Sequence, residues 1–231
     1  MVRMPRVVIP GVPHHITQRG VRSLPIFFDA DDRPLYLELM RHHAARQGLH
    51  FATYCLMDNH VHLVAIPERE DSLRRAIGEA HRLYTLEVNL RMGTKGYLFQ
   101  GRPFSCPLDD SHYLAALRYV ERNPVRAGIV SQAWEYPWSG ARFHLGLTPE
   151  DPLIDQDALT HFGCTPEDWH GLLQTELDEI QSLRERTRSG RPCGSDAFIA
   201  DLETLTGRIL CPHKRGRHTN QVLCGTTGPD C

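Results

Sequence analysis

Two histidines that flank one apolar residue, His60 and His62, are the side chains best suited to chemistry in this chain of 231 residues. They lie in a run of apolar and β-branched residues, 54–66, that ends at a proline, which is the pattern of a strand. Residues two apart on a strand project from the same face, so both imidazoles point the same way. Two neutral imidazoles side by side can hold a divalent metal. The alternative is a pair of hydrogen-bonded sheet histidines without a metal.

Tyr119 and Asn123 form a second pair, four residues apart in a segment that we expect to be helical. They therefore share one helical face, with Cβ atoms about 6 Å apart. A phenol can act as a nucleophile and form a covalent intermediate. An amide oxygen is a hard ligand for Mg²⁺ or Mn²⁺, so Asn123 would complete a site with His60 and His62. The chemistry predicted is attack of Tyr119 on a DNA phosphorus that the metal polarises, leaving a phosphotyrosine and a free 3′-hydroxyl.

Each of these residues also has a plainer interpretation. Tyr119 could pack its ring in the core, and Asn123 could simply end the helix before a proline. Tyr84 and Tyr113 are the other tyrosines considered as nucleophiles. Tyr113 has a leucine, which cannot ligate metal, four residues later, so we favour Tyr119.

Periodicity and turn signals indicate the elements that must position these residues. An aspartate–asparagine pair at 58–59 predicts the turn of a hairpin. The expected strands are 13–19, 49–57, 60–66 and an extended segment within 97–108, and the expected helices are 31–47, 71–91 and 110–123. We expect the first helix to bury Leu35, Leu39 and Met40, and the second to bury Leu73, Ile77, Leu83, Leu86 and Leu90.

The resulting order, β-α-β-β-α-β-α, matches the split βαβ, ferredoxin-like arrangement with one added helix. We therefore predict an α+β fold with an antiparallel sheet and helices on one face. Helical patterns at 166–187 and 195–209 predict a C-terminal extension. The domains expected are a catalytic domain over 1–145, a helical extension over 146–217 and a disordered tail over 218–231.

The composition is that of a globular protein, with 41% hydrophobic and 23% charged residues. No apolar run is long enough for a membrane span, and the first residues lack the apolar core of a signal peptide, so we expect a cytoplasmic location. The seven cysteines are scattered without a Cys-x-x-Cys pair, which favours reduced thiols. A zinc site from Cys211, His213, His218 and Cys224 is conceivable, but its spacing matches no standard pattern.

The net charge of −2 conceals an uneven distribution of charge. Residues 1–145 carry 18 basic and 14 acidic side chains, residues 146–183 carry nine acidic and no basic ones, and residues 184–231 carry eight basic and five acidic ones. Of the 26 basic residues 24 are arginine, which binds phosphate bidentately and stacks on bases; a GC-rich genome would also favour it. The acidic stretch is expected to be a solvated face, the alternative being a cover over the active site.

Taken together, the two motifs resemble those of the REP-associated tyrosine transposases, a branch of the HUH-type single-tyrosine transposases. The HUH signature corresponds to His60-Val61-His62, and the Tyr-x-x-x-Asn signature corresponds to Tyr119–Asn123, followed by Pro-Val-Arg-Ala-Gly. The resemblance covers roughly residues 5–217. One departure is Asp58, where the family usually has proline; it places a negative charge near the metal site. Further similar segments are Pro10–His15, Gln18–Gly20, Phe99–Arg102, Tyr136–Ser139 and Gly190–Pro192.

The resemblance implies a DNA transposition and recombination enzyme that nicks and rejoins single-stranded DNA at REP-type hairpins through a 5′-phosphotyrosine intermediate. It implies Tyr119 as nucleophile, His60, His62 and Asn123 as ligands of Mg²⁺ or Mn²⁺, recognition of a hairpin with an adjacent guide tetranucleotide, and a monomer rather than a dimer. Two other activities remain open, a non-catalytic hairpin-binding protein and a metallohydrolase of small phosphoesters. The residues expected to contact DNA are Arg19, Arg22, Arg102, Arg118, Arg122, Arg126, Arg188, Arg191, Lys214 and Arg215.

Overall fold

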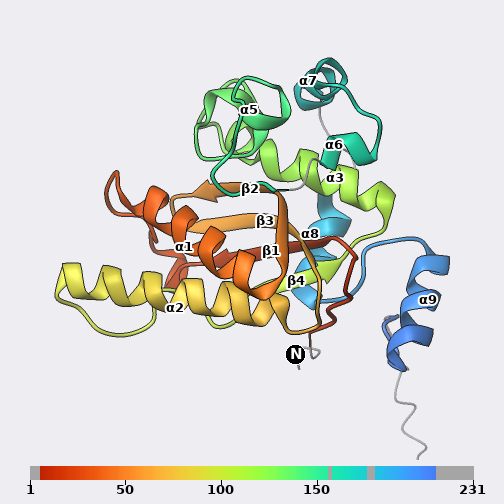
Figure 1. Cartoon of the computed structure of the whole chain (residues 1–231), viewed down its shortest axis with the longest axis horizontal. Coiled ribbons are helices and arrows are strands. Elements are labelled where there is room, and N and C mark those ends of the chain that lie inside the picture. The colour runs from red at the N-terminus through yellow and green to blue at the C-terminus, as the bar shows by residue number, and fades with distance from the viewer. Residues whose placement is uncertain (1–5, 156–157, 176–179, 212–231) are drawn as a thin grey trace, which may run out of the picture.

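A computed structural model describes residues 6–155, 158–175 and 180–211 of the chain. They form an α+β fold built on a four-stranded sheet (Figure 1). Within these described ranges, no helix combines the length and the apolar character needed to cross a bilayer.

The sheet consists of β1 (His14–Arg19), β2 (Leu49–Met57), β3 (His60–Pro67) and β4 (Phe104–Pro107). Its order is β2-β3-β1-β4 and every neighbouring pair is antiparallel, which confirms the ferredoxin-like prediction. The predicted hairpin is also confirmed, because Asp58 and Asn59 connect β2 to β3. The central position of β1 brings its residues directly beside His60 and His62.

Two long helices, α1 (Asp32–Gln47) and α2 (Ser72–Met92), cover one face of the sheet (Figure 1). The apolar faces expected for them are partly wrong. α1 buries Tyr36, Leu37, Met40 and Ala44, whereas Leu35 and Leu39 are only partly buried. α2 buries Leu73 and Ile77 as expected, but its buried stripe continues through Ala80, His81 and Tyr84. It leaves Leu86 and Leu90 exposed.

The segment before β4 also differs from its prediction. The extended stretch expected within 97–108 forms regular strand only over β4, and residues 97–102 form a loop. This loop is attached to the end of β1 by a bridge between Phe99 and Gly20 and by a hydrogen bond from the Gln100 amide to the Arg19 carbonyl.

The opposite face of the sheet is covered by α3 (Asp110–Glu121) and by segments that follow it, so the expectation of helices on one face holds only for α1 and α2. α3 begins where predicted, with Asp109 as its N-cap, but it ends before Asn123. Asn123 instead begins a short helix, α4 (Asn123–Arg126). Pro124 is tolerated in its first turn, because a backbone N–H at that position would have no partner within the helix. The predicted helix over 110–123 is therefore two helices with Arg122 between them.

The C-terminal extension packs on this second face as well. Its Trp169, Leu173 and Leu183 share one apolar cluster with Leu117 and Val120 of α3, so residues on both sides of the predicted boundary at 145 build a common core. The elements after α4 are the 3₁₀ turn η2 (Ala133–Glu135), α5 (Ala141–His144), α6 (Ala158–His161), α7 (Pro166–Gln174), α8 (Ile180–Ser189) and α9 (Asp196–Thr206). One other 3₁₀ turn, η1 (Val21–Ser23), follows β1 near the N-terminus.

Glu121 joins the extension to the sheet. Its carboxylate is fully buried and accepts hydrogen bonds from the Thr53 hydroxyl at 2.6 Å and from the Trp169 indole at 2.8 Å. A third contact, at 2.6 Å, joins it to Nδ1 of His144. This carboxylate therefore links β2, α3, α5 and α7.

We expect Glu121→Ala to destabilise the protein by about 3–5 kcal/mol, because it leaves the buried partners of the carboxylate unpaired. The measurement is the free energy of unfolding in urea. Glu87→Ala, which removes an exposed carboxylate on α2, is the control and should change stability by less than about 0.5 kcal/mol. An equal effect of the two substitutions would contradict the role of Glu121.

Candidate active site

His60 and His62 project from the face of β3 that α3 covers. Their ring centroids are 5.1 Å apart and their planes meet at 76°. His62 is buried and His60 is half-buried at the end of the strand. The strand periodicity therefore placed both imidazoles correctly on one face.

Tyr119 of α3 lies directly against His62 of this pair. Its ring meets that of His62 edge-on, with centroids 5.4 Å apart. Only 3% of Tyr119 is exposed, so the phenol is held in the protein rather than presented on its surface. The structure thus brings together the two motifs, which are separated by more than fifty residues in the sequence.

His15 is a member of the site that the sequence did not single out. On the sheet His62 lies opposite Thr17, so His15 is its diagonal neighbour on the same face. The two rings stack at 5.4 Å, and Nε2 of His15 lies 3.1 Å from Nδ1 of His62. Alternation along a strand allows only one of His14 and His15 to face the site, and nothing in the local sequence distinguishes either from an ordinary polar strand residue. His14 points the other way and contacts the carbonyl of Val12.

The hydrogen bonds of the two HUH histidines fit metal binding. Nδ1 of His62 is engaged by His15, and Nδ1 of His60 lies 2.6 Å from the side-chain oxygen of Asn59. Within the described part of the chain neither Nε2 makes a hydrogen bond, so both are available to a ligand. Metal-binding histidines in proteins commonly use the other ring nitrogen for such an orienting contact.

Both imidazoles are also held neutral, as a metal ligand must be. Burial lowers the pKa of His60 to about 4, with the positive charges of Arg19 and Arg184 adding to the effect. Burial lowers the pKa of His62 well below its usual value, and the neighbouring histidines and arginines act in the same direction.

Asn123 follows Tyr119 by one helical turn and is buried. Its amide nitrogen donates to the carbonyls of Tyr119 and Val120, so the side-chain oxygen is the atom left to act as an acceptor. Among the described residues there is no cluster of three or more histidine, cysteine, aspartate or glutamate side chains suited to a metal. A metal centre here therefore requires a ligand of another kind, and ligation by Asn123 remains a prediction.

Two arginines approach Tyr119 from different elements. Arg184 of α8 donates from Nε to the phenolic oxygen at 3.1 Å, and its guanidinium carbon lies 5.7 Å from the ring centroid. The guanidinium carbon of Arg126 lies 4.9 Å from the same centroid. In the sequence Arg184 belongs to the basic C-terminal region, and local periodicity cannot relate α8 to α3.

The basic residues expected to contact DNA differ in how the structure places them. Arg118 and Arg122 turn toward the end of α7, where Arg118 donates to Thr175 and the buried Arg122 donates to the carbonyl of Leu173. A phosphate contact from either side chain would require those hydrogen bonds to break. Five others have exposed side chains: Arg19, Arg22, Arg102, Arg126 and Arg188. Arg191 is partly buried and donates to the carbonyl of Leu210. Lys214 and Arg215 lie outside the described residues.

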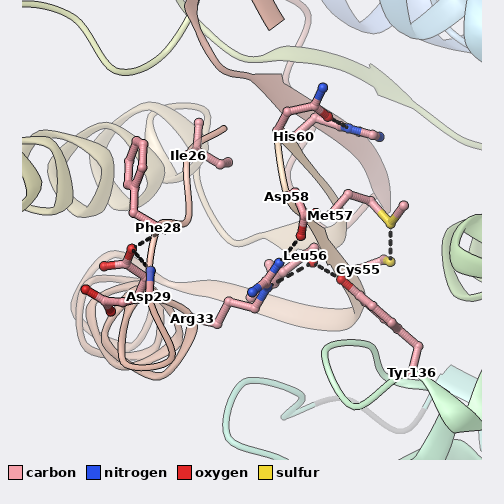
Figure 2. Close-up of polar contacts among 12 residues, drawn as sticks. Ile26, Phe28, Asp29, Arg33, Cys55, Leu56, Met57, Asp58, His60 and Tyr136 are labelled. Atoms are coloured by element: carbon pink, nitrogen blue, oxygen red, sulfur yellow. Dashed lines mark hydrogen bonds and ion pairs between the residues drawn. The ribbon is translucent and has the colours of Figure 1, made fainter. Parts of the chain in front are cut away.

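Asp58 turns away from the histidines. Its carboxylate pairs with Arg33 of α1, which also donates to the carbonyl of Leu56, while His60 projects in a different direction (Figure 2). The charge that Asp58 adds beside the HUH motif is therefore balanced by a guanidinium on the other side of the turn.

The two competing tyrosines lie elsewhere. Tyr84 is in the core between the sheet and α1 and α2, and its hydroxyl donates to the carbonyl of Ile26. Tyr113 lies two turns before Tyr119 on α3, where its ring packs against His161 and Phe162. Of the zinc ligands considered, Cys211 is an exposed free thiol and the other three lie outside the described residues.

The similarity of this fold to a solved structure agrees with the resemblance of the motifs. The chain superposes on a REP-associated tyrosine transposase bound to a REP hairpin, with a TM-score of 0.55 and 17% identity over 68% of this chain and 93% of that one. The chain has the fold of a REP-associated tyrosine transposase. A candidate transposase from Deinococcus radiodurans R1 is similar over 52% of this chain and 97% of that one, with 16% identity and a TM-score of 0.37. No family model and no curated protein matches the chain.

Proposed function

We propose that this protein is a transposase-like enzyme that nicks and rejoins single-stranded DNA at REP-type hairpins. The observation that carries the proposal is the placement of the Tyr119 ring against His62, which lies beside His60, with Arg184 on the phenolic oxygen. Such an arrangement would supply a nucleophile, two imidazole nitrogens suited to a metal and a cation beside the attacking oxygen.

In the proposed reaction Tyr119 attacks a backbone phosphorus. A bond forms between its oxygen and the phosphorus, the bond to the 3′ oxygen breaks, and the chain is left with a 5′-phosphotyrosine. The phenolic proton passes to solvent, and the departing 3′ oxygen takes a proton from solvent. Attack by a 3′-hydroxyl on the phosphotyrosine reverses these steps and rejoins the strand.

His60 and His62, with Asn123 as the third ligand, would hold Mg²⁺ or Mn²⁺. A divalent ion bound there polarises the phosphodiester and offsets negative charge in the transition state. The substrate class rests on the motif resemblance and on the similar fold of a transposase bound to a REP hairpin. Two exposed arginines beside the site, Arg19 near His60 and Arg126 near Tyr119, are suited to phosphate.

The proposal predicts that a single-stranded REP-type hairpin gives two products with Mn²⁺, a shortened strand and a strand covalently attached to the protein. Chelation of the metal should abolish both products on a denaturing gel. The corresponding perfect duplex, which offers no hairpin, is the matched substrate control. Binding without cleavage in every divalent metal would favour a non-catalytic hairpin-binding protein, and turnover without an adduct would favour a metallohydrolase.

A further inference from the structure

The helix α8, which belongs to the C-terminal extension, reaches the active site at two points. Arg184 donates to the oxygen of Tyr119, and Oγ1 of Thr187 lies 2.7 Å from Nδ1 of His15. Arg184 and Thr187 are three residues apart, so both side chains leave the same side of the helix. α8 thus contacts both halves of the site, the nucleophile and the histidine that orients His62.

Two hydrogen bonds connect Thr187 of α8 to His62 through His15, and the donors available determine their direction. The hydroxyl of Thr187 donates to the carbonyl of Leu183 at 2.8 Å, because a carbonyl can only accept. Oγ1 therefore accepts the hydrogen on Nδ1 of His15, which leaves Nε2 of that neutral ring as an acceptor. The hydrogen between the two imidazoles must then sit on Nδ1 of His62. As a result Nε2 of His62 carries the lone pair that a metal needs.

We propose that α8 completes the catalytic centre. In this proposal, which rests on the proposed function, Arg184 is a catalytic residue that binds the oxygen of Tyr119. Thr187 is a positioning residue that acts through His15 and fixes the tautomer of His62. The C-terminal extension accordingly contributes two residues, Arg184 and Thr187, to the active site.

The role of Arg184 follows from the charge on the Tyr119 oxygen during the reaction. When a 3′-hydroxyl attacks the phosphotyrosine, the bond between phosphorus and the Tyr119 oxygen breaks and the electron pair stays on that oxygen. A guanidinium remains protonated, so it stabilises the phenolate by a charge-assisted hydrogen bond without taking part in proton transfer. The same contact aims the oxygen at phosphorus in the forward direction.

For Arg184 the test is the rate of adduct formation and of rejoining in Arg184→Gln. We expect both rates to fall by about 10²-fold, the loss typical of one donor to a developing oxyanion. Added guanidinium should restore part of the activity of Arg184→Gly, and Arg184→Lys should retain more activity than the glutamine variant. Arg41→Gln, which removes an exposed arginine from α1 across the sheet, is the matched control and should react at the unsubstituted rate. An unchanged rate in Arg184→Gln, or loss of activity that guanidinium does not restore, would overturn the role of Arg184.

For Thr187 the test is the affinity for Mn²⁺, followed by electron paramagnetic resonance. We expect Thr187→Val to weaken binding by roughly tenfold, the lower end of the range for outer-shell partners, and Thr187→Ser to retain it. Thr204→Val is the control, since Thr204 donates to the carbonyl of Ala200 in the same way on the distant α9. Equal Mn²⁺ affinity in the valine and serine variants at position 187 would overturn this role.

Nitrogen NMR of the unsubstituted protein tests the proposal without any variant. The hydrogen of the His62 ring is expected on Nδ1, and finding it on Nε2 would contradict the arrangement. Neither the NMR nor the Mn²⁺ measurement depends on DNA cleavage, so α8 can be tested even if the proposed function fails. Conversely, a normal adduct on Tyr119 in Arg184→Gln would leave the proposed function intact and remove only the role of Arg184.

Discussion

Tyr119→Phe is expected to fold and to bind divalent metal but to form no covalent adduct with hairpin DNA. The substitution removes only the phenolic oxygen, which is the attacking atom in the proposed reaction. Loss of a nucleophile typically costs about 10⁴–10⁶-fold in rate, so no product should be visible on a denaturing gel. The hydrogen bond from Arg184 is the only contact of that oxygen shown among the described residues, so the fold should persist.

Tyr113→Phe is the matched control for this experiment. It makes the same chemical change on the same helix, two turns earlier, where the ring packs against Phe162 rather than against the histidines. We expect this variant to form the adduct at nearly the unsubstituted rate. An adduct in Tyr119→Phe, or its loss in Tyr113→Phe alone, would show that the nucleophile has been assigned to the wrong residue.

Replacing both His60 and His62 by glutamine is expected to have the second largest effect. The site would lose both imidazole nitrogens, and Mn²⁺ affinity should fall by more than about 100-fold, because loss of an outer-shell partner alone costs 10–100-fold. Cleavage should then be absent at Mn²⁺ concentrations that saturate the unsubstituted protein. Calorimetric titration with Mn²⁺ and the denaturing gel give the two readouts.

His42→Gln provides the control for metal binding, since His42 is exposed on α1 at a distance from the site. It should leave both Mn²⁺ affinity and cleavage unchanged. If the double variant still cleaved the hairpin at the normal Mn²⁺ concentration, His60 and His62 would not be the metal ligands.

The sequence predicted the order of elements because each signal was local. The hairpin turn at Asp58 and Asn59 and the strand periodicity around them needed no knowledge of the rest of the chain. The apolar faces of the helices are less predictable, since the size of a leucine does not decide whether the sheet covers it. In α2 the stripe that packs on the sheet contains Ala76, Ala80 and His81, and Leu86 lies outside it.

The same distinction applies to the site. His60 and His62 were correctly related to each other because both lie on one strand. His15, Arg184 and Thr187 reach them only through the pairing of β1 with β3 and the packing of α8, and no local period encodes either contact. An antiparallel pairing of the first strand with 60–66, had its register been known, would have indicated His15.

The most direct test of the central claim is to identify the residue that carries the DNA. The adduct formed by the unsubstituted protein on a hairpin with Mn²⁺ would be digested with protease and nuclease, and the modified peptide sequenced by mass spectrometry. We predict a nucleotide attached through its 5′-phosphate to Tyr119. Attachment to any other residue, or a cleaved strand with no attached peptide, would contradict the account.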